Sequence, residues 1–339
     1  MPLPEQAMER PDGACLAYGV VLRPTTQPYL LVFTCLPMSI LVIGSYNTDL
    51  VMHGPRLPAP GETILGGTFA QHHGGKGANQ AVAAARLAVA GQVRFVAKVG
   101  DDAFGQQALT QLRAEGVDTA GVRVAPGQPS GVALINVATA TGENSISVAA
   151  GANEHLCPAD TDAALANAAP GTVVVLQLEI PLPTVIHAAR QAAARGLRVV
   201  LNPAPAQPLP AGLGADLYVL TPNETEAEAL TGVRVTDTAT ASLAVERLHA
   251  AGISRVILTL GAQGAYWSDG TGAALVAAPA VQAVDTTAAG DCFTGALAVA
   301  LAEGLALPEA VGFACQAAAR AVTRPGAQAS LPTRAELAS

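Results

Sequence analysis

The chain has 339 residues, of which half are hydrophobic and 13% are charged, so it has enough apolar content for a large core, which excludes a mainly disordered protein. Its formal net charge of -8 argues against a nucleic-acid surface, which needs a basic patch, but leaves small anionic ligands open. No apolar run reaches the ~18 residues of a membrane span. The five cysteines have no paired short spacing, which indicates neither a zinc site nor a disulfide framework but a reducing cytoplasm.

The first 37 residues differ from the rest of the chain. They carry prolines at irregular intervals and no sustained helix or strand period, whereas a buried-strand pattern, MSILVIGSYNTDLV, begins at Met38. We therefore predict that residues 1–37 are an N-terminal extension that is disordered or comes from a misassigned translation start. The alternative is an added strand or clasp formed by YLLVF, residues 29–33, because short apolar runs are ambiguous.

From residue 39 on, short β-branched runs alternate with alanine-rich stretches of helical period. The predicted strands lie within residues 39–45, 93–100, 172–180, 198–205, 217–223 and 255–261. Helices are predicted within 102–116, 181–196 and 239–252. Continuous apolar strands separated by amphipathic helices predict an α/β fold, in which a parallel sheet is covered on both faces.

Two stretches, at about residues 48–71 and 123–150, break this rhythm. Both alternate apolar and polar residues and carry turn signals, with no helix between. They predict hairpin strands of a small separate sheet at the carboxyl ends of the core strands. In open α/β folds ligands bind at that edge, so this sheet would act as a lid.

A glycine-rich loop, HHGGKGANQA, occupies residues 72–81. It is not a Walker loop, because Gly77 rather than a hydroxyl residue follows Lys76, and it lacks the dinucleotide pattern as well. Gly74, Gly75 and Gly77 would permit close backbone approach, with Lys76 and Asn79 as donors. The loop therefore suits a hydroxyl-rich ligand as well as a phosphate, and an ordinary glycine turn before a helix is the alternative.

A second candidate site lies in VDTTAAGDCFTGALAVALAEG, residues 284–304. Apolar residues at helical spacing place a helix start close to Gly290, so residues 286–290 would offer backbone N–H groups at its positive end. Asp291 is either an ordinary first-turn acid or a base for an alcohol that attacks a phosphoryl group.

Taken together, these segments resemble the ribokinase family of sugar kinases over about residues 39–335. The matching stretches, in the family's order, are GSYNTDLV, GGKGANQA, AGAN, LQLEIP, TPNETEAEALTG, LTLGAQGA, DTTAAGD and VTRPGAQASLP. The resemblance implies that residues 38–339 form a kinase domain with a three-layer αβα, Rossmann-like core, a mostly parallel sheet and a small β lid. It also implies transfer of the γ-phosphoryl group of ATP to the 5-hydroxyl of D-ribose, with magnesium and potassium as cofactors and a homodimer formed through the lid.

The resemblance also implies roles for individual residues. Asp291 matches the catalytic base and Gly290 the anion hole. The implied sugar ligands are Asn47, Asp49, Gly75, Lys76, Asn79, Glu179 and Asp291. The implied nucleotide-binding residues are Asn223, Thr259, Leu260, Gly261, Ala262, Gln263, Gly264, Gly290 and Cys315. Glu226 would lie near magnesium, and the implied monovalent-cation ligands are Asp285, Thr287, Ala321, Arg324, Gly326 and Ser330, several through backbone carbonyls.

Some features depart from the family pattern or leave alternatives open. Cys315 replaces the histidine or asparagine expected near adenine, and Pro325 stands in the cation loop. His72 and His73 are expected to be lid or hinge residues without a ligand role, and Asn223 with Glu226 could simply cap a helix. The alternatives are a sibling kinase for 2-deoxyribose, fructose or a nucleoside, and a non-catalytic sugar-binding regulator. No nucleic acid or membrane partner is expected.

Overall fold

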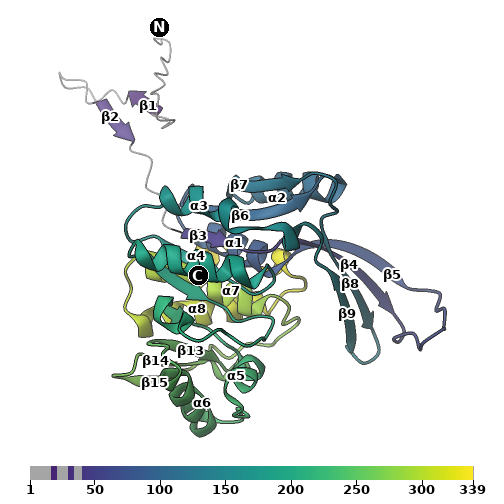
Figure 1. Ribbon diagram of the computed structural model, residues 1–339. Coiled ribbons are helices and arrows are strands. Elements are labelled where there is room, and N and C mark those ends of the chain that lie inside the picture. Colours follow the sequence, from purple (N-terminus) through teal and green to yellow (C-terminus); the bar gives the residue numbers. More distant parts are fainter. Residues whose placement is uncertain (1–16, 21–29, 34–39, 339) are drawn as a thin grey trace. The chain divides into compact units, whose positions relative to one another are not determined.

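The computed structural model describes residues 17–20, 30–33 and 40–338 (Figure 1). The chain divides into two compact units, Met1–Pro37 and Met38–Ser339. In the first unit, β1 (Ala17–Val20) and β2 (Leu30–Phe33) pair antiparallel in a two-stranded sheet. The prediction of disorder or a misassigned start for the other residues up to 37 falls outside the described residues.

The second unit is built on a nine-stranded sheet, in the order β15-β14-β13-β12-β11-β10-β3-β6-β7, whose strands are parallel from β13 to β7. The predicted parallel strands are present, and the α/β fold class is confirmed. At one end of the sheet, β14 and β15 run antiparallel, which the sequence patterns do not predict; β15 is the edge strand. The bounds are β3 Ile40–Ile43, β6 Val93–Gly100, β7 Asp118–Ala125, β10 Val173–Leu176, β11 Arg198–Leu201, β12 Val219–Leu220, β13 Val256–Thr259, β14 Ala265–Ser268 and β15 Ala273–Val276.

Both faces of this sheet are covered by helices, because alternate residues of its apolar central strands pack into two separate cores. Ile40 and Val42 of β3 belong to one core, and Leu41 and Ile43 belong to the other. Helices α1, α2, α7 and α8 contribute to the first core, and α3, α4, α5 and α6 to the second. Their bounds are α1 Lys76–Leu87, α2 Ala103–Ala114, α3 Pro158–Ala166, α4 Leu182–Ala194, α5 Glu224–Thr231, α6 Thr238–Ala250, α7 Ala289–Ala302 and α8 Leu307–Ala321; α9 is Arg334–Leu337. None of the described helices is long and apolar enough to cross a membrane.

A separate four-stranded sheet, which we call the lid, projects from this core (Figure 1). Its order is β5-β4-β8-β9, with β4 Asn47–Gly54, β5 Thr68–Gly74, β8 Gly131–Ala138 and β9 Asn144–Ala149. The predicted start of its second half at about 123 is wrong, because residues 118–125 form β7, which pairs parallel with β6 of the core. As an edge strand, β7 is half exposed, so it shows the same alternation as a lid strand.

Candidate active site

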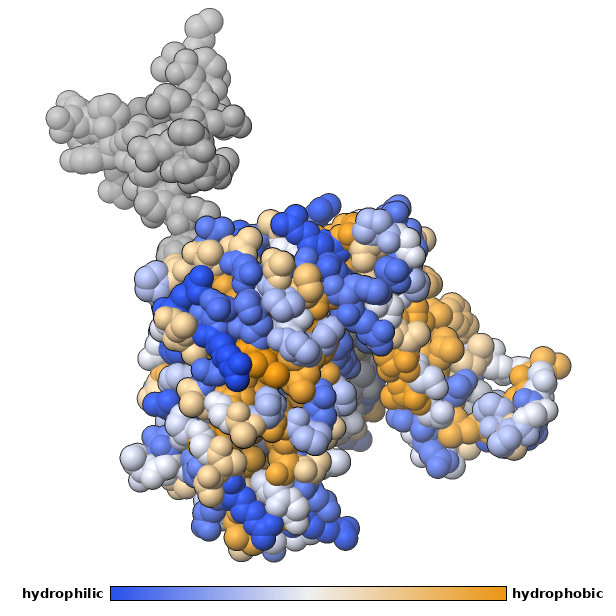
Figure 2. Space-filling view, viewed as in Figure 1, coloured by the Kyte–Doolittle hydropathy of each residue, from blue (hydrophilic) through white to orange (hydrophobic). Residues whose placement is uncertain are grey.

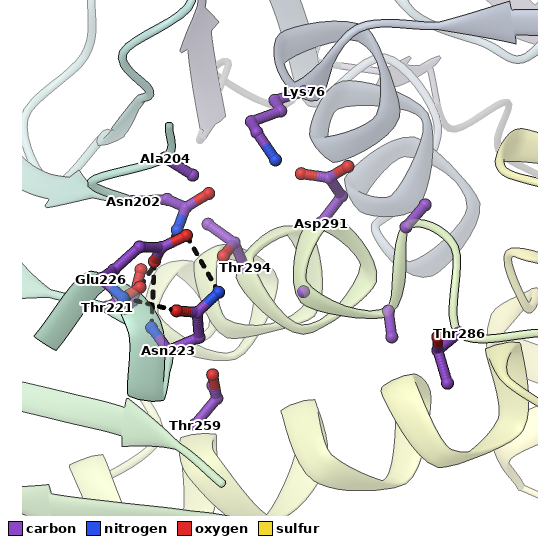
Figure 3. A pocket seen from close by; sticks show the side chains of 13 residues that line it. Lys76, Asn202, Ala204, Thr221, Asn223, Glu226, Thr259, Thr286, Asp291 and Thr294 are labelled. Carbon is purple, nitrogen blue, oxygen red and sulfur yellow. Dashed lines mark hydrogen bonds between the residues drawn. The ribbon is translucent and has the colours of Figure 1, made fainter. Parts of the chain in front are cut away.

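A pocket opens at the carboxyl ends of β11, β12 and β13, where it faces the first turn of α7 (Figure 3). Open parallel sheets bind ligands at this edge. Lys76 and Asp291 point into the pocket from α1 and α7, and Glu226 and Asn223 face them from α5 (Figure 3). The lining residues are Lys76, Asn202, Ala204, Thr221, Asn223, Glu226, Thr259, Thr286, Ala288, Ala289, Gly290, Asp291 and Thr294.

The first turn of α7 can bind an anion. Ala288 precedes the helix with a φ of 59°, and it is the one non-glycine residue with positive φ among those described. This strained conformation starts the helix abruptly. Among the described hydrogen bonds, none uses the N–H groups of Gly290 and Asp291, which point along the positive end of the helix. The predicted anion hole thus has two free donors at the pocket wall.

Asp291 is a buried carboxylate with one amide donor on each oxygen. Its exposed fraction is 7%, Asn79 Nδ2 donates to Oδ2 at 2.9 Å, and Gln80 Nε2 donates to Oδ1 at 2.9 Å. Burial raises the pKa of Asp291, although Lys76 and the two amides oppose that rise. A carboxylate with a raised pKa is a stronger base, and each oxygen keeps a lone pair for an incoming hydroxyl.

Lys76 and Glu179 connect the glycine loop with the end of β10. Glu179 Oε2 accepts from the backbone N–H of Lys76 at 3.0 Å and from Ser45 Oγ at 2.5 Å. Burial lowers the pKa of the Lys76 ammonium, but the carboxylates of Asp291, Glu179 and Glu226 outweigh burial and raise it overall. Lys76 therefore stays charged beside the carboxylates that surround it.

Asn47 and Asp49 lie at the base of the lid strand β4. Asn47 is 4% exposed, and its Oδ1 accepts from Asn153 Nδ2 at 2.9 Å, which leaves the Asn47 amide nitrogen as a donor. Burial and repulsion from Glu179 and Asp291 raise the pKa of Asp49 to about 7. The predicted sugar ligands from β4, α1, α7 and the end of β10 therefore converge.

The glycines of the loop are needed for packing against the chain itself. A Cβ at Gly77 would lie 2.6 Å from Ser45 N, and a Cβ at Gly74 would lie 2.2 Å from Asp49 Oδ2. Gly75 has a φ of 86° and directly precedes α1. The close backbone approach predicted from the sequence thus brings α1 against the residues that follow β3.

On the opposite wall of the pocket, Asn223 and Glu226 form the capping pair that the sequence left open. Asn223 Oδ1 accepts from Glu226 N at 2.8 Å, and Glu226 Oε2 accepts from Asn223 N at 2.9 Å. Burial raises the pKa of Glu226, which is 8% exposed and lines the pocket. Capping thus positions both side chains at the pocket. The predicted nucleotide loop follows β13 and contains a short 3-10 helix, Gly261–Gln263. An isolated parallel β-bridge joins the backbone of Asn223 to that of Thr259, at the end of β13.

The predicted cation loop is joined to the first turn of α7 through Asp285. Its carboxylate accepts from Thr287 N at 2.9 Å and from Gly326 N at 2.8 Å. The Arg324 guanidinium is a cation without an acceptor atom and pairs with Glu336, so only the Arg324 backbone carbonyl could bind a cation. Ser330 is buried and donates to Ala327 O. The described residues contain no group of three or more histidine, cysteine, aspartate or glutamate side chains that could hold a metal.

Other predicted residues have plainer surroundings. Cys315 is 3% exposed in α8 and packs in the first core, where burial raises its pKa to about 11. His73 Nδ1 lies 2.6 Å from the hydroxyl of Tyr46, at the junction of the lid and the core. Whether Cys315 contacts adenine stays a prediction.

Three buried polar residues around the site were not identified from the sequence. They are Gln80 beside Asp291, Asn153 beside Asn47, and Gln328, whose Nε2 lies 3.2 Å from Asn79 Oδ1. Each one falls inside a quoted motif stretch, but its partner lies far away in the chain. The signal was the amide side chain within an otherwise apolar or glycine-rich segment.

A buried carboxylate and a helix N-terminus share one pocket at the edge of a parallel sheet, as expected of a kinase that phosphorylates an alcohol. The chain matches the pfkB family carbohydrate kinase model over residues 38–334, and it belongs to that family. The family predicted from the motifs is thereby confirmed.

Similar proteins agree with this assignment. The chain is 44% identical to a ribokinase of Haemophilus influenzae, over 88% of this chain and 96% of that protein. It is 39% identical to a deoxyribokinase of Salmonella typhi, over 87% of this chain and 96% of that protein. Its structure resembles that of an Arabidopsis thaliana ribokinase complexed with ribose and ATP, with a TM-score of 0.83 and 35% sequence identity. The similarity covers 89% of this chain and 98% of the Arabidopsis chain.

Proposed function

We propose that this protein is an ATP-dependent kinase that phosphorylates the 5-hydroxyl of D-ribose. The observation that carries the proposal is Asp291, a buried carboxylate held by two amides, next to the free N–H groups at the start of α7. The ribokinases among the similar proteins support ribose as the acceptor and ATP as the donor. The simultaneous presence of Asp291, Gly290, Asn223 and Glu226 argues against a non-catalytic regulator.

The reaction follows from these positions. Asn47, Asp49, Lys76, Asn79 and Glu179 would hold the sugar so that its 5-hydroxyl faces Asp291. Asp291 takes the hydroxyl proton as the sugar oxygen bonds to the γ-phosphorus, and the bond from that phosphorus to the β,γ-bridging oxygen breaks to release ADP. Lys76 and the N–H groups of Gly290 and Asp291 stabilise the charge on the transferred group.

Magnesium and potassium belong to the proposal. Magnesium, when bound with ATP, neutralises phosphate charge. Glu226 lies on the pocket wall, but both of its oxygens already accept from Asn223, so it suits water on the metal better than the metal itself. Asp285, Thr287 and the carbonyls of the loop up to Ser330 would hold the monovalent cation, and Asp285 joins the two segments involved.

The test is an ADP-release assay with D-ribose, 2-deoxyribose, fructose and adenosine, each in potassium or sodium. We expect the highest kcat/KM with ribose and a higher rate in potassium. Preference for 2-deoxyribose, the substrate class of the Salmonella relative, would keep Asp291 as base and change the sugar. Sugar binding without turnover on any of the four would favour the non-catalytic alternative.

Substitution of Gly290 by alanine tests the role of the anion hole in catalysis without a loss of folding stability. A Cβ at this position would meet no heavy atom within 4 Å, so the variant should fold normally, and alanine favours the helix by up to about 1 kcal/mol. The methyl group would project into the pocket and displace the transferred phosphate, which we expect to lower kcat about 10²-fold. Thermal unfolding and steady-state kinetics measure the two effects, with Gly272→Ala, outside the pocket, as control. An unchanged kcat would contradict the anion hole.

We also propose a homodimer formed through the lid, in the cytoplasm. Figure 2 shows apolar side chains on the surface of the lid. The exposed apolar residues include Ile146 and Val148, which the strand register places on the face of Asp49, and Phe69 and Leu134, which it places on the other face. We propose that the face with Ile146 and Val148 forms the contact, so we expect Ile146→Glu to yield monomers in sedimentation and Phe69→Glu to remain dimeric. A monomeric unmodified chain would contradict the proposal.

A further inference from the structure

Gln80 is a fully buried amide whose polar atoms all have partners. It follows Asn79 on α1, and its exposed fraction is 0%. Its Nε2 donates to Asp291 Oδ1 at 2.9 Å and to Asn202 Oδ1 at 3.2 Å, and its Oε1 accepts from Gln177 Nε2 at 2.6 Å. Gln80 does not line the pocket, so it reaches the chemistry only through Asp291.

Gln177 fixes the orientation of the Gln80 amide through a hydrogen bond to its oxygen. Gln177 follows β10 and is also fully buried, and the hydrogen that it donates requires the oxygen of Gln80 on that side. The nitrogen of Gln80 must then face Asp291. Gly44 directly follows the neighbouring strand β3 and leaves room for the Gln177 side chain, since a Cβ there would lie 1.9 Å from Gln177 Oε1.

The short reach of Gln80 depends on close packing between α1 and α7. Gly295 lies one turn after Asp291 on α7, and a Cβ at Gly295 would lie 2.7 Å from the backbone oxygen of Gln80. The missing side chain lets the helices approach until Gln80 and Asp291 are in hydrogen-bond contact. Asn79 donates to the other oxygen from the same helix.

We propose that Gln80 is a positioning residue for phosphoryl transfer: its amide, oriented by Gln177, holds Oδ1 of Asp291 so that the carboxylate is aimed at the sugar hydroxyl. This inference rests on the proposed role of Asp291 as base. Asn79 is itself a predicted sugar ligand, whereas Gln80 is not, so Gln80 holds the base whether or not sugar is bound. General-base catalysis requires such fixed geometry.

Several charged groups around Asp291 influence the pKa of its carboxyl group. Lys76 on α1 favours its ionised form, Glu179 after β10 opposes it, and Asp49 on the lid and Glu226 on α5 are also electrostatically coupled to it. Burial raises the pKa of Asp291, and Gln80 is among the donors that lower it. Loss of that donor must therefore raise the pKa further, since the ionised form loses a hydrogen bond.

The experiment replaces Gln80 by methionine, which has a similar volume and no donor. We expect the pKa of the Asp291 carboxyl, followed by ¹³C NMR without sugar or ATP, to rise by about one pH unit. The acidic limb of the pH dependence of kcat/KM should move by the same amount. We expect kcat at neutral pH to fall at least about tenfold and the Kd for D-ribose to change less than about threefold, because Gln80 does not line the pocket.

Two further variants keep the test decisive. Thr184→Val, on α4, removes a buried hydrogen bond to Leu156 O; neither residue lines the pocket, so this variant should reduce stability without moving the titration. Gln80→Glu retains the shape and the contact with Gln177 but places a second carboxyl against Oδ1, so it should move the acidic limb by more than one pH unit. This variant serves if Gln80→Met does not fold.

An Asp291 titration that is unchanged in both Gln80 variants would overturn the inference, as would loss of stability alone. A second outcome is that the Gln80 variants shift the NMR titration of Asp291 but the Asp291→Asn variant keeps full turnover. Gln80 would then contact the carboxylate as inferred, and the proposed role of Asp291 as base would be wrong. The two failures are thus distinguishable.

Discussion

Replacement of Asp291 by asparagine is expected to lower kcat about 10³-fold, because the variant has no base to accept the proton of the sugar hydroxyl. Asparagine keeps the size of the side chain but presents an NH₂ group to one of its two amide donors, Asn79 or Gln80. Asp291 is also a predicted sugar ligand, so the Kd for D-ribose, measured by calorimetry, should weaken by no more than about tenfold.

The matched control is Asp101→Asn, an exposed aspartate between β6 and α2. It should leave kcat, Kd and thermal unfolding unchanged. If Asp291→Asn kept its rate while it bound sugar normally, the base would have to be sought elsewhere in the pocket.

Replacement of Asp49 by asparagine is expected to weaken D-ribose binding by about 10- to 100-fold and to stabilise the free protein. The ionised carboxylate would accept from two sugar hydroxyls, and a hydrogen bond to a charged group contributes about 1.5–3 kcal/mol. Burial and repulsion from Glu179 and Asp291 raise its pKa to about 7. At neutral pH the ionised Asp49 carboxylate therefore lowers the free energy of unfolding, while it strengthens sugar binding.

The pH dependence has a definite sign. The folded pKa of Asp49 lies above the ordinary aspartate value of 3.8, so the folded state binds more protons than the unfolded state between about pH 4 and 7. The free energy of unfolding therefore falls as pH rises through this window, by up to about 4 kcal/mol. Asparagine does not titrate, so the advantage of Asp49→Asn in melting temperature should grow from pH 5 to pH 8.

Sugar binding should follow the opposite course. Because the ionised form accepts hydrogen bonds, ribose affinity should rise about tenfold from pH 6 to pH 8, which corresponds to titration of one group near pH 7. Asp49→Asn should remove this dependence. Glu143→Gln, an exposed position in the turn of the lid between β8 and β9, is the control. A pH-independent ribose affinity in the unmodified chain would contradict the role of Asp49.

The layers of the fold and the start of α7 could be predicted from local patterns in the chain. Apolar runs such as VVVL at 173–176 and ILVI at 40–43 are buried on both faces, so they indicate a covered parallel sheet. The start of α7 near Gly290 followed from apolar residues at helical spacing. Both are local properties of consecutive residues, for which periodicity is a sufficient signal. The roles in the site came from motif resemblance.

Two features could not be predicted from local patterns: the sheet that a half-exposed strand joins, and the amides that hold the Asp291 carboxylate. β7 alternates like a lid strand, and only its pairing with β6 places it in the core. Gln80 lies beside Asn79 in the same quoted motif, yet its partners Gln177, Asn202 and Asp291 are 97, 122 and 211 residues away. The physical reason is that hydrogen-bond partners meet through helix packing at Gly295 and strand register, and neither leaves a periodic trace in the chain.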